Sequence, residues 1–179
     1  NEKSLRNLAE YAMKEGNNEE MRQEAIATLS VWPNPSVLDR VDGRLRGPVK
    51  RDTGMVRSAF ENGLLGLLKN RQEQIRLSAV KAAGRLNVKT AEPLLWGMLN
   101  ADPKAEVRKE ALMTLAGMQY VRLGQAIQQA ISDKEKIVRI AGIDLLGKSA
   151  VPADLMVKLL AEVINTKSSE EKQAALLTL

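Results

Sequence analysis

The sequence contains no cysteine and no histidine. Thiolate and imidazole nucleophiles, disulfide scaffolds, zinc modules and attached c-type haem are therefore excluded within these 179 residues. No apolar run approaches the roughly 18 residues that span a bilayer, and the first residues lack the basic and then apolar layout of a secretory signal. We therefore predict no catalytic residue, no metal ligand, no cofactor and no membrane insertion for this chain, and we expect that it is not itself an enzyme.

Aromatic residues are also scarce, at 3% of the chain, whereas leucine occurs 25 times and alanine 21 times. This balance favours helices over strands, which prefer aromatic and β-branched side chains. An all-α fold is therefore predicted. The net charge of +5, from 27 basic and 22 acidic residues, is modest for this length, so it permits a nucleic-acid partner without indicating one.

The chain contains internal repeats. Five segments share an apolar residue, then usually an arginine, and then an alanine or glycine three positions later, although the last segment is degenerate. The basic residues of successive segments are 54, 32, 31 and 33 positions apart, which indicates tandem units with a single insertion between the first and the second. The five segments are Met21-Arg22…Ala25, Ile75-Arg76…Ala79, Val107-Arg108…Ala111, Val138-Arg139…Gly142 and Glu171-Lys172…Ala175.

Each unit is predicted to form two helices, because apolar residues recur at helical spacing on both sides of a short polar break. A single hairpin cannot bury its apolar stripe alone, so we expect a right-handed α-solenoid superhelix of about five hairpins with one loop insertion. As one repeat domain, 1–179, it divides into repeats 1–31, 53–87, 88–118, 119–149 and 150–179 and the insertion 32–52. The predicted helices are Leu5–Met13, Glu20–Leu29, Arg57–Leu68, Glu73–Leu86, Glu92–Leu99, Ala105–Met118, Leu123–Ile131, Ile137–Leu146, Asp154–Ile164 and Glu170–Leu179.

Two of the repeats resemble a known family. The matching residues are Asp102…Val107-Arg108-Lys109-Glu110-Ala111-Leu112 and Asp133…Val138-Arg139…Gly142-Ile143…Leu146-Gly147. The pattern resembles the HEAT-repeat family, in particular its short bacterial variety seen in phycobilisome-lyase-like repeats, and it covers nearly the whole chain apart from the insertion. The resemblance implies an α-solenoid. It implies little about function, because such solenoids serve scaffolds, adaptors and a few enzymes; a chromophore-lyase activity is implied only by the namesake of the repeats.

Three of the repeat arginines follow a polar residue of the preceding turn by six positions. This register predicts a ladder in which each arginine ties the turn of one repeat to its neighbour, a structural role. An anion site at the repeated arginine is the alternative, and we favour the ladder. Its predicted members are the pairs Asn70 and Arg76, Asp102 and Arg108, and Asp133 and Arg139.

The insertion, Trp32–Asp52, contains three prolines and two glycines and cannot be one continuous helix. Residues 39–57 sum to +3 of the net charge of +5. Arginine matches carboxylate and phosphate oxygens, so one interpretation is a docking loop for an acidic or phosphate-bearing partner. The other is a loop folded back on its own repeats, with its aspartates neutralised by adjacent arginines. The candidate binding residues here are Arg40, Arg44, Arg46, Lys50 and Arg51.

A second resemblance concerns the segment from Trp32 to Gly47. Its residues Trp32-Pro-x-Pro-Ser-Val-Leu-Asp-Arg-Val-Asp-Gly-Arg-x-Arg-Gly resemble a segment of large multidomain bacterial proteins, in which a sugar-dehydrogenase-like propeller precedes HEAT repeats and a c-type cytochrome domain follows. The resemblance implies an internal, extracytoplasmic module of an exported protein whose parent chain could carry an oxidoreductase domain. Without it, a cytoplasmic location is expected. The start at Asn1 and the end at Leu179, within an apolar helical pattern, also led us to expect a fragment.

The inner face of the second helices mixes apolar residues with scattered charge, which suits a protein surface better than a phosphate track. We therefore predict a non-catalytic scaffold for another protein or for flanking domains of the same chain. The alternative is a nucleic-acid-binding protein related to the HEAT-like alkylpurine DNA glycosylases. The segment Gly142–Ser149 fits the phosphate-loop pattern but is expected within a helix. Candidate partner-binding residues on this face are Leu77, Lys81, Lys109, Met113 and Ile140.

Overall fold

The computed structural model describes residues 2–39, 42–149 and 151–178, and it confirms the predicted all-α fold. These residues form ten α-helices and one short 3-10 helix, and the only β pairing among them is an isolated bridge. None of the described helices is both long and apolar enough to cross a membrane. The helices are α1 Glu2–Met13, α2 Glu19–Ser30, α3 Thr53–Leu67, α4 Glu73–Arg85, η1 Lys89–Ala91, α5 Glu92–Ala101, α6 Ala105–Gly117, α7 Leu123–Ile131, α8 Lys136–Leu146, α9 Ala153–Thr166 and α10 Ser169–Leu176.

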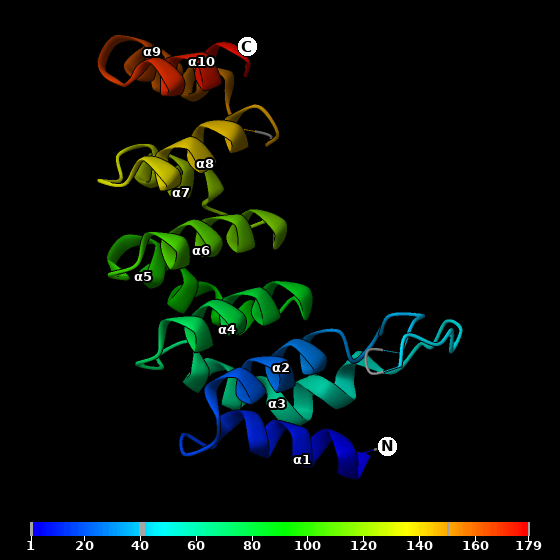
Figure 1. Cartoon of the computed structure of the whole chain (residues 1–179). Helices are drawn as coiled ribbons and strands as arrows, with labels where there is room; N and C mark the ends of the chain where they lie inside the picture. Colours follow the sequence, from blue (N-terminus) through cyan, green and yellow to red (C-terminus); the bar gives the residue numbers. More distant parts are fainter. Residues whose placement is uncertain (1, 40–41, 150, 179) are drawn as a thin grey trace. The chain divides into compact units, whose positions relative to one another are not determined.

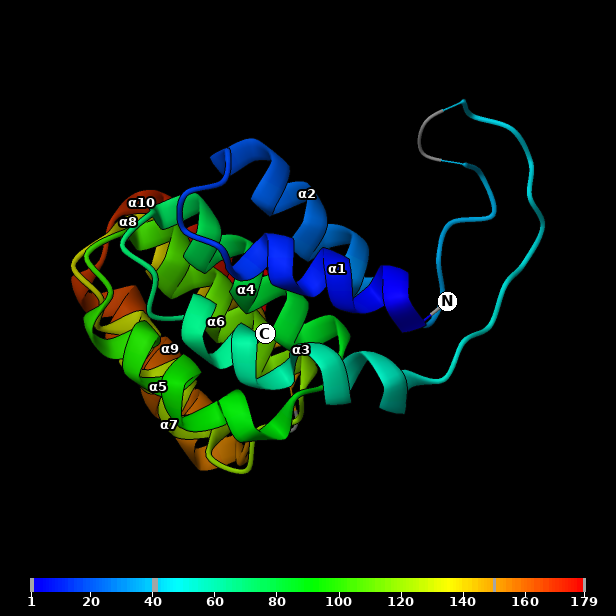
Figure 2. The same cartoon turned by 90° about the horizontal axis from the view of Figure 1, so that it is seen from below.

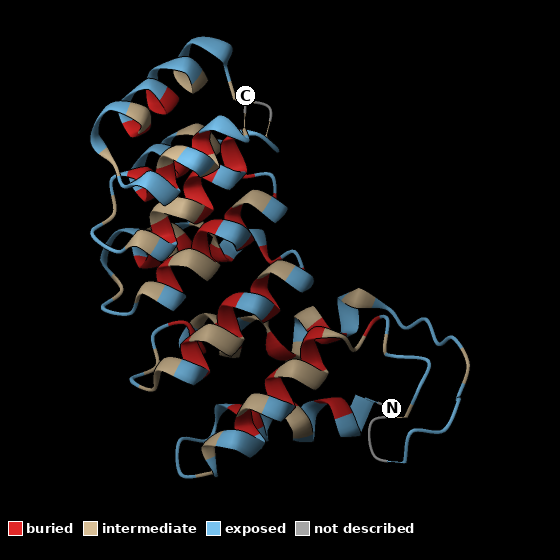
Figure 3. Ribbon diagram, turned by 45° about the horizontal axis from the view of Figure 1, so that its top comes forward, coloured by how far each residue is buried: buried red, intermediate tan, exposed pale blue. Residues whose placement is uncertain are grey.

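The chain divides into two compact units, Asn1–Ala91 (unit 1) and Glu92–Leu179 (unit 2). In unit 1, α1 packs on α2 and α3, and α4 packs on the same two helices. The apolar faces of all four helices meet in one core, whose residues are coloured as buried in Figure 3. Its largest fully buried side chains include Leu5, Ile26, Leu29, Phe60, Leu64 and Ile75.

Unit 2 consists of three helical hairpins, α5–α6, α7–α8 and α9–α10 (Figure 1). The second helices α6, α8 and α10 contact one another in that order, and the first helices α5, α7 and α9 do the same. Two layers of helices with stacked hairpins are the arrangement of an α-solenoid. Fully buried residues between the layers include Leu95, Leu112, Leu115, Ile127 and Ile143.

Side-chain caps determine where several helices begin. The Asn18 side chain accepts a hydrogen bond from the Met21 amide at 3.1 Å at the start of α2. The Asp52 side chain accepts one from the Gly54 amide at 2.8 Å, so α3 begins at Thr53. Sequence reasoning predicted a start at Arg57, four residues too late, because it missed this cap.

Gly142 lies inside α8, where the helix packs closely on α7. A Cβ atom at Gly142 would lie 3.1 Å from the Cβ of Ala130 and 3.1 Å from the Cγ1 of Ile131, so a larger residue here would require α7 side chains to shift. The helix continues to Leu146. The expectation that the phosphate-loop pattern lies within a helix is thus confirmed for its first five residues, and their amides are not arranged as a loop around a phosphate.

Candidate docking site

The insertion loop Trp32–Asp52 connects α2 to α3 within unit 1 and extends away from the helices (Figure 2). Its tip is a narrow backbone hairpin. The Asp39 amide donates to the Arg44 carbonyl at 2.8 Å, and the Arg46 amide donates to the Val37 carbonyl at 2.8 Å. Gly43, with a φ of 69°, closes the turn by donating to the Asp39 carbonyl at 3.0 Å. The tip therefore has a defined local structure.

Two of the predicted docking arginines form ion pairs inside this tip. Arg46 Nε lies 3.3 Å from an Asp39 carboxylate oxygen, and Arg46 Nη2 lies 3.0 Å from an Asp42 oxygen. Arg44 Nε lies 3.6 Å from Asp42. These side chains are exposed, so the pairs contribute little stability, but they neutralise much of the charge of Arg44 and Arg46. Arg40, another candidate, lies outside the described residues.

Arg51 holds the base of the loop together. Its guanidinium lies over the Trp32 ring, 4.5 Å from the ring centroid, which is a cation–π contact. Arg51 Nη1 donates to the Trp32 carbonyl at 3.2 Å, and the Arg51 amide donates to the Pro33 carbonyl at 2.9 Å. The two ends of the insertion loop are therefore joined by side-chain and backbone contacts of one arginine.

A cavity of about 700 Å³ lies between the insertion loop, α2 and the last turn of α4; we call it the loop cavity. Most of its lining is apolar, and three arginines and one aspartate add charge. Arg85, from α4, donates from Nη1 to the Ser30 hydroxyl at 3.1 Å. The lining includes Val31, Trp32, Pro35, Leu38, Asp39, Arg46, Val49, Arg51 and Arg85.

Sequence reasoning did not place Arg85 in a site with the insertion. Its position on the helix could have indicated this placement. Arg85 lies nine residues after Arg76 and is the last residue of α4, which packs on α2 beside the start of the insertion. Lys50 is exposed and does not line the cavity.

The five candidates on the second helices lie elsewhere. Leu77 and Lys81 belong to α4 of unit 1, whereas Lys109 and Met113 belong to α6 and Ile140 to α8 of unit 2. Met113 is 44% exposed, Leu77 and Ile140 are half-buried, and Lys109 pairs with Glu106 at 2.9 Å. None of the five lines the loop cavity, so the structure does not bring the two groups of candidates into one site.

The repeat arginines have a different environment, because they are largely buried. Arg108 donates from Nε and from Nη2 to the two carboxylate oxygens of Asp133, each at 2.7 Å. Its Nη1 donates to the Asp102 carbonyl at 2.8 Å. Arg108 thus ties the turn of its own hairpin to the turn of the next one. Each side chain of this pair is thus bonded both to the other and to the backbone.

The charges of this pair stabilise each other. Burial acts to raise the pKa of Asp133, but hydrogen bonds from the Arg108 side chain and the Glu135 amide outweigh it, so that the pKa lies below its usual value. The hydrogen bond to Asp133 likewise raises the pKa of Arg108. Both groups are therefore charged near neutral pH.

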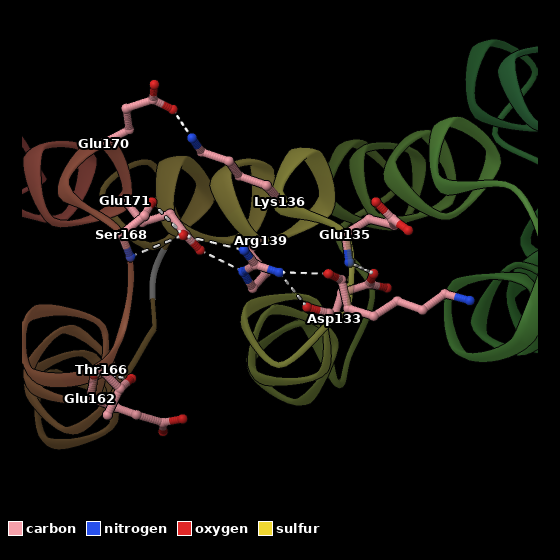
Figure 4. A network of polar contacts seen from close by, with 10 residues as sticks. Asp133, Glu135, Lys136, Arg139, Glu162, Thr166, Ser168, Glu170 and Glu171 are labelled. Atoms are coloured by element: carbon pink, nitrogen blue, oxygen red, sulfur yellow. Dashed lines mark hydrogen bonds and ion pairs between the residues drawn. The ribbon is translucent and has the colours of Figure 1, made fainter.

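Arg139 makes the next contact along unit 2 (Figure 4). Its Nη1 donates to the Asp133 carbonyl at 2.9 Å, and its Nη2 donates to Glu171 at 3.2 Å, with a second bond from Nε to the same carboxylate. Glu171 is only 1% exposed, and it also accepts from the Ser168 hydroxyl at 2.7 Å. The hydrogen bond from Arg139 lowers the pKa of Glu171 to about 2.

Sequence reasoning missed Glu171 as a member of the ladder. It looked for the carboxylate in the turn, six residues before the basic position, where Thr166 stands. The signal that was available is the capping box Ser168-x-x-Glu171, which places this carboxylate at the start of α10 beside α8.

Between the two hairpins of unit 1, Arg22 has no carboxylate partner among the residues that the structure describes. Arg22 is fully buried; its Nε donates to the Ala12 carbonyl at 3.0 Å and its Nη1 to the Gln72 side-chain oxygen at 2.9 Å. Its Nη2 is buried without a hydrogen-bond partner. Arg76 donates from Nη1 to the Asn70 and Arg71 carbonyls, each at 3.0 Å.

In the ranges that the structure describes, no group of three or more histidine, cysteine, aspartate or glutamate residues is arranged to hold a metal ion.

Comparison with known proteins supports the repeat fold. Residues 91–179 match the family model described as HEAT repeats, and no curated protein matches the chain. An engineered protein of known structure has a TM-score of 0.51 at 13% identity, covering 98% of this chain and 95% of its own. A designed armadillo repeat protein, solved in complex with the peptide (KR)4, has a TM-score of 0.54 at 16% identity, covering 98% and 82%. At these identities the likeness shows the fold alone, a helical-repeat fold that is typical of protein-interaction scaffolds and typically non-catalytic.

Proposed function

We propose that this chain is a non-catalytic scaffold that holds another protein, or a neighbouring domain of its own parent chain, at the insertion loop. The observation that carries the proposal is the loop cavity of about 700 Å³, which an insertion forms on an otherwise regular repeat fold. Insertions in repeat proteins emerge on one face, often the binding face, and concave apolar sites with a few polar groups are typical binding sites.

The second helices offer a further, separate contact surface in unit 2. Met113 and Ile140 lie on α6 and α8, which are in contact, and Met113 is 44% exposed. Flexible thioether side chains adapt to varied apolar partners. We propose that this surface is a second, independent protein-contact site.

We also propose, from the resemblance of the segment Trp32 to Gly47, that the chain is an internal module of a larger exported bacterial protein. An immunoblot of fractionated source cells tests this. A band far above 19.7 kDa in the extracytoplasmic fraction is expected, and a cytosolic band of the chain's own size would contradict the proposal.

The alternative function, nucleic-acid binding, predicts a steep salt dependence. Each phosphate contacted would lower the logarithm of the binding constant by about 0.9 per tenfold increase in salt. Titration of duplex DNA across salt concentrations separates the two functions. Because Asp39 and Asp42 neutralise Arg44 and Arg46, we expect weak DNA binding with a shallow slope.

Site-specific photocrosslinking tests the scaffold function itself. A photoreactive amino acid is placed at Val49, which lines the loop cavity and is 40% exposed, and at Val121, which is 94% exposed in unit 2 as a matched control. In source cells we expect a discrete adduct from position 49 and none of the same size from position 121. Equal adducts at both positions, or none at position 49, would contradict the proposal.

A further inference from the structure

The arginines that line the loop cavity differ in whether a carboxylate neutralises them. Of the three arginines in its lining, Arg46 pairs with Asp39. Arg51 and Arg85 pair with no carboxylate of the described residues; their side-chain contacts are with Trp32 and with the Ser30 hydroxyl. Two uncompensated guanidinium groups therefore face one apolar cavity, which gives it a positive potential and suits an anionic group.

The same wall has an excess of hydrogen-bond donors. A guanidinium carries five N–H donors, and Arg51 and Arg85 each use Nη1 in the contacts described above. Both arginines are exposed residues, so their remaining N–H groups are accessible to an occupant of the cavity. An occupant that supplies acceptor oxygens therefore fits this wall better than one that supplies donors.

The rest of the cavity selects for apolar side chains. Val31 and Pro35 line it, together with Leu38, which is 50% exposed, and Val49, which is 40% exposed. A volume of about 700 Å³ is in the range of sites that enclose a small ligand, so it would take a short segment of chain and not a folded surface. The occupant thus needs acidic and apolar groups within a few residues of each other.

We propose that the loop cavity binds an acidic peptide segment of a partner protein, with a carboxylate between Arg51 and Arg85 and an apolar side chain against Leu38 and Val49. This inference rests on the proposed scaffold function and names the chemistry of its partner. A single-stranded nucleic acid fits less well, because it needs open aromatic faces for its bases, and Arg51 lies 4.5 Å above the Trp32 ring.

Titration with synthetic peptides tests the inference. The probe is a short fluorescein-labelled peptide of alternating glutamate and leucine, and the matched probe replaces glutamate with lysine. In parallel, the variant Trp96→Phe leaves Trp32 as the only tryptophan, so that its fluorescence reports on the cavity itself. We expect the acidic peptide to bind and to change the Trp32 emission, and the basic peptide to do neither.

Substitutions locate the binding. Arg51→Gln and Arg85→Gln should each weaken the acidic peptide about tenfold, the order expected for one charge-assisted hydrogen-bonded contact. Arg44→Gln is the matched control, because Arg44 has the same charge in the same loop but does not line the cavity; its effect should be less than about twofold, by screening. Arg51→Lys retains the positive charge but removes the planar guanidinium that stacks on Trp32, so it distinguishes the effect of the charge from that of the stacked geometry. Circular dichroism of each variant confirms that it is folded.

Several results would overturn the inference: no binding of the acidic peptide at millimolar concentration, equal binding of the basic peptide, or equal losses in Arg44→Gln and Arg85→Gln. If the peptide fails while the photoreactive residue at position 49 still gives its adduct in cells, the scaffold function stands and the occupant has another chemistry. If both fail, the proposed function fails with it.

Discussion

In unit 2, successive hairpins are joined by largely buried arginine–carboxylate pairs, whereas in unit 1 the corresponding buried arginine meets only neutral acceptors. Arg108 reaches Asp133 and Arg139 reaches Glu171, each through two hydrogen bonds. Arg22 has an amide oxygen of Gln72 and one unpaired nitrogen instead. The loop cavity of unit 1 is lined by two further arginines without a carboxylate partner among the described residues, Arg51 and Arg85. The repeated arginines of unit 2 therefore make contacts between hairpins, whereas the binding site that we propose uses arginines outside the repeat pattern.

The turns at these joints share one local geometry. The Asp133 side chain accepts from the Glu135 amide at 2.8 Å, and the Asn70 side chain accepts from the Gln72 amide at 3.0 Å. The units differ in the charge at this position and in the residue that the buried arginine reaches, which is Asp133 for Arg108 and Gln72 for Arg22. This similarity allows the comparison to be tested by exchanging the residues.

The largest expected effect is loss of the carboxylate in unit 2. Asp133→Ala leaves Arg108, whose side chain is 3% exposed, without its counter-charge, and should lower the free energy of unfolding by about 3–5 kcal/mol. Gln72→Ala in unit 1 removes a neutral acceptor and should cost about 1.5–3 kcal/mol. Urea unfolding of both variants measures the difference. Equal losses would mean that the two joints do not differ as described.

Glu171→Gln should lower stability at neutral pH and change its acid dependence. The pKa of Glu171 is lowered from 4.5 to about 2 by the hydrogen bond from Arg139, so its stabilising contribution is complete above pH 4.5 and is lost as the pH falls toward 2. The difference in unfolding free energy between the two proteins should therefore be constant near neutral pH and shrink below about pH 4.5. A difference that does not vary between pH 7 and pH 2.5 would contradict the pairing with Arg139.

Asn70→Asp should stabilise unit 1 by about 1 kcal/mol, because it places a carboxylate in the turn geometry of Asp133, two residues before the Gln72 side chain that accepts from the buried Arg22, whose Nη2 is unpaired. The measurement is the midpoint of thermal or urea unfolding. The control is Asn70→Asp combined with Arg22→Met, in which the added charge has no partner and the gain should vanish. A gain that persists in the double variant would show that Arg22 is not responsible.

The smallest effect is expected at the loop tip. Arg44→Gln removes an exposed ion pair with Asp42, and it should change the free energy of unfolding by less than about 0.5 kcal/mol. A loss above 1 kcal/mol would show that the tip contributes to the stability of unit 1 as the buried pairs contribute to unit 2.

The helices could be predicted from sequence because apolar spacing and the repeated arginine are local signals. Leu123–Ile131 was predicted at the bounds that the structure shows, and other helices differ by a few residues where a cap such as Asp52 determines the start. The ladder could be predicted only where its acid stands in the turn. Sequence reasoning missed Glu171 because its carboxylate belongs to a capping box at the start of α10 and not to the turn before it.

The candidate site was less accessible to sequence reasoning for a physical reason. Composition identified the basic insertion, but which of its cations are neutralised depends on distances across a hairpin turn, as for Arg44 and Arg46 with Asp42. Arg85, which lies 33 residues after the last residue of the insertion, reaches the cavity from the end of α4. Such contacts between remote segments have no signature in local spacing.

Hydrogen–deuterium exchange with and without the glutamate–leucine peptide tests the central claim most directly, because it reports on both units in one experiment. The account predicts slower exchange in the insertion loop, in α2 and at the end of α4, which surround the loop cavity, and unchanged exchange at the Arg108–Asp133 and Arg139–Glu171 joints. Slower exchange confined to α6, α8 and α10 would place the binding site on the repeat helices and contradict it.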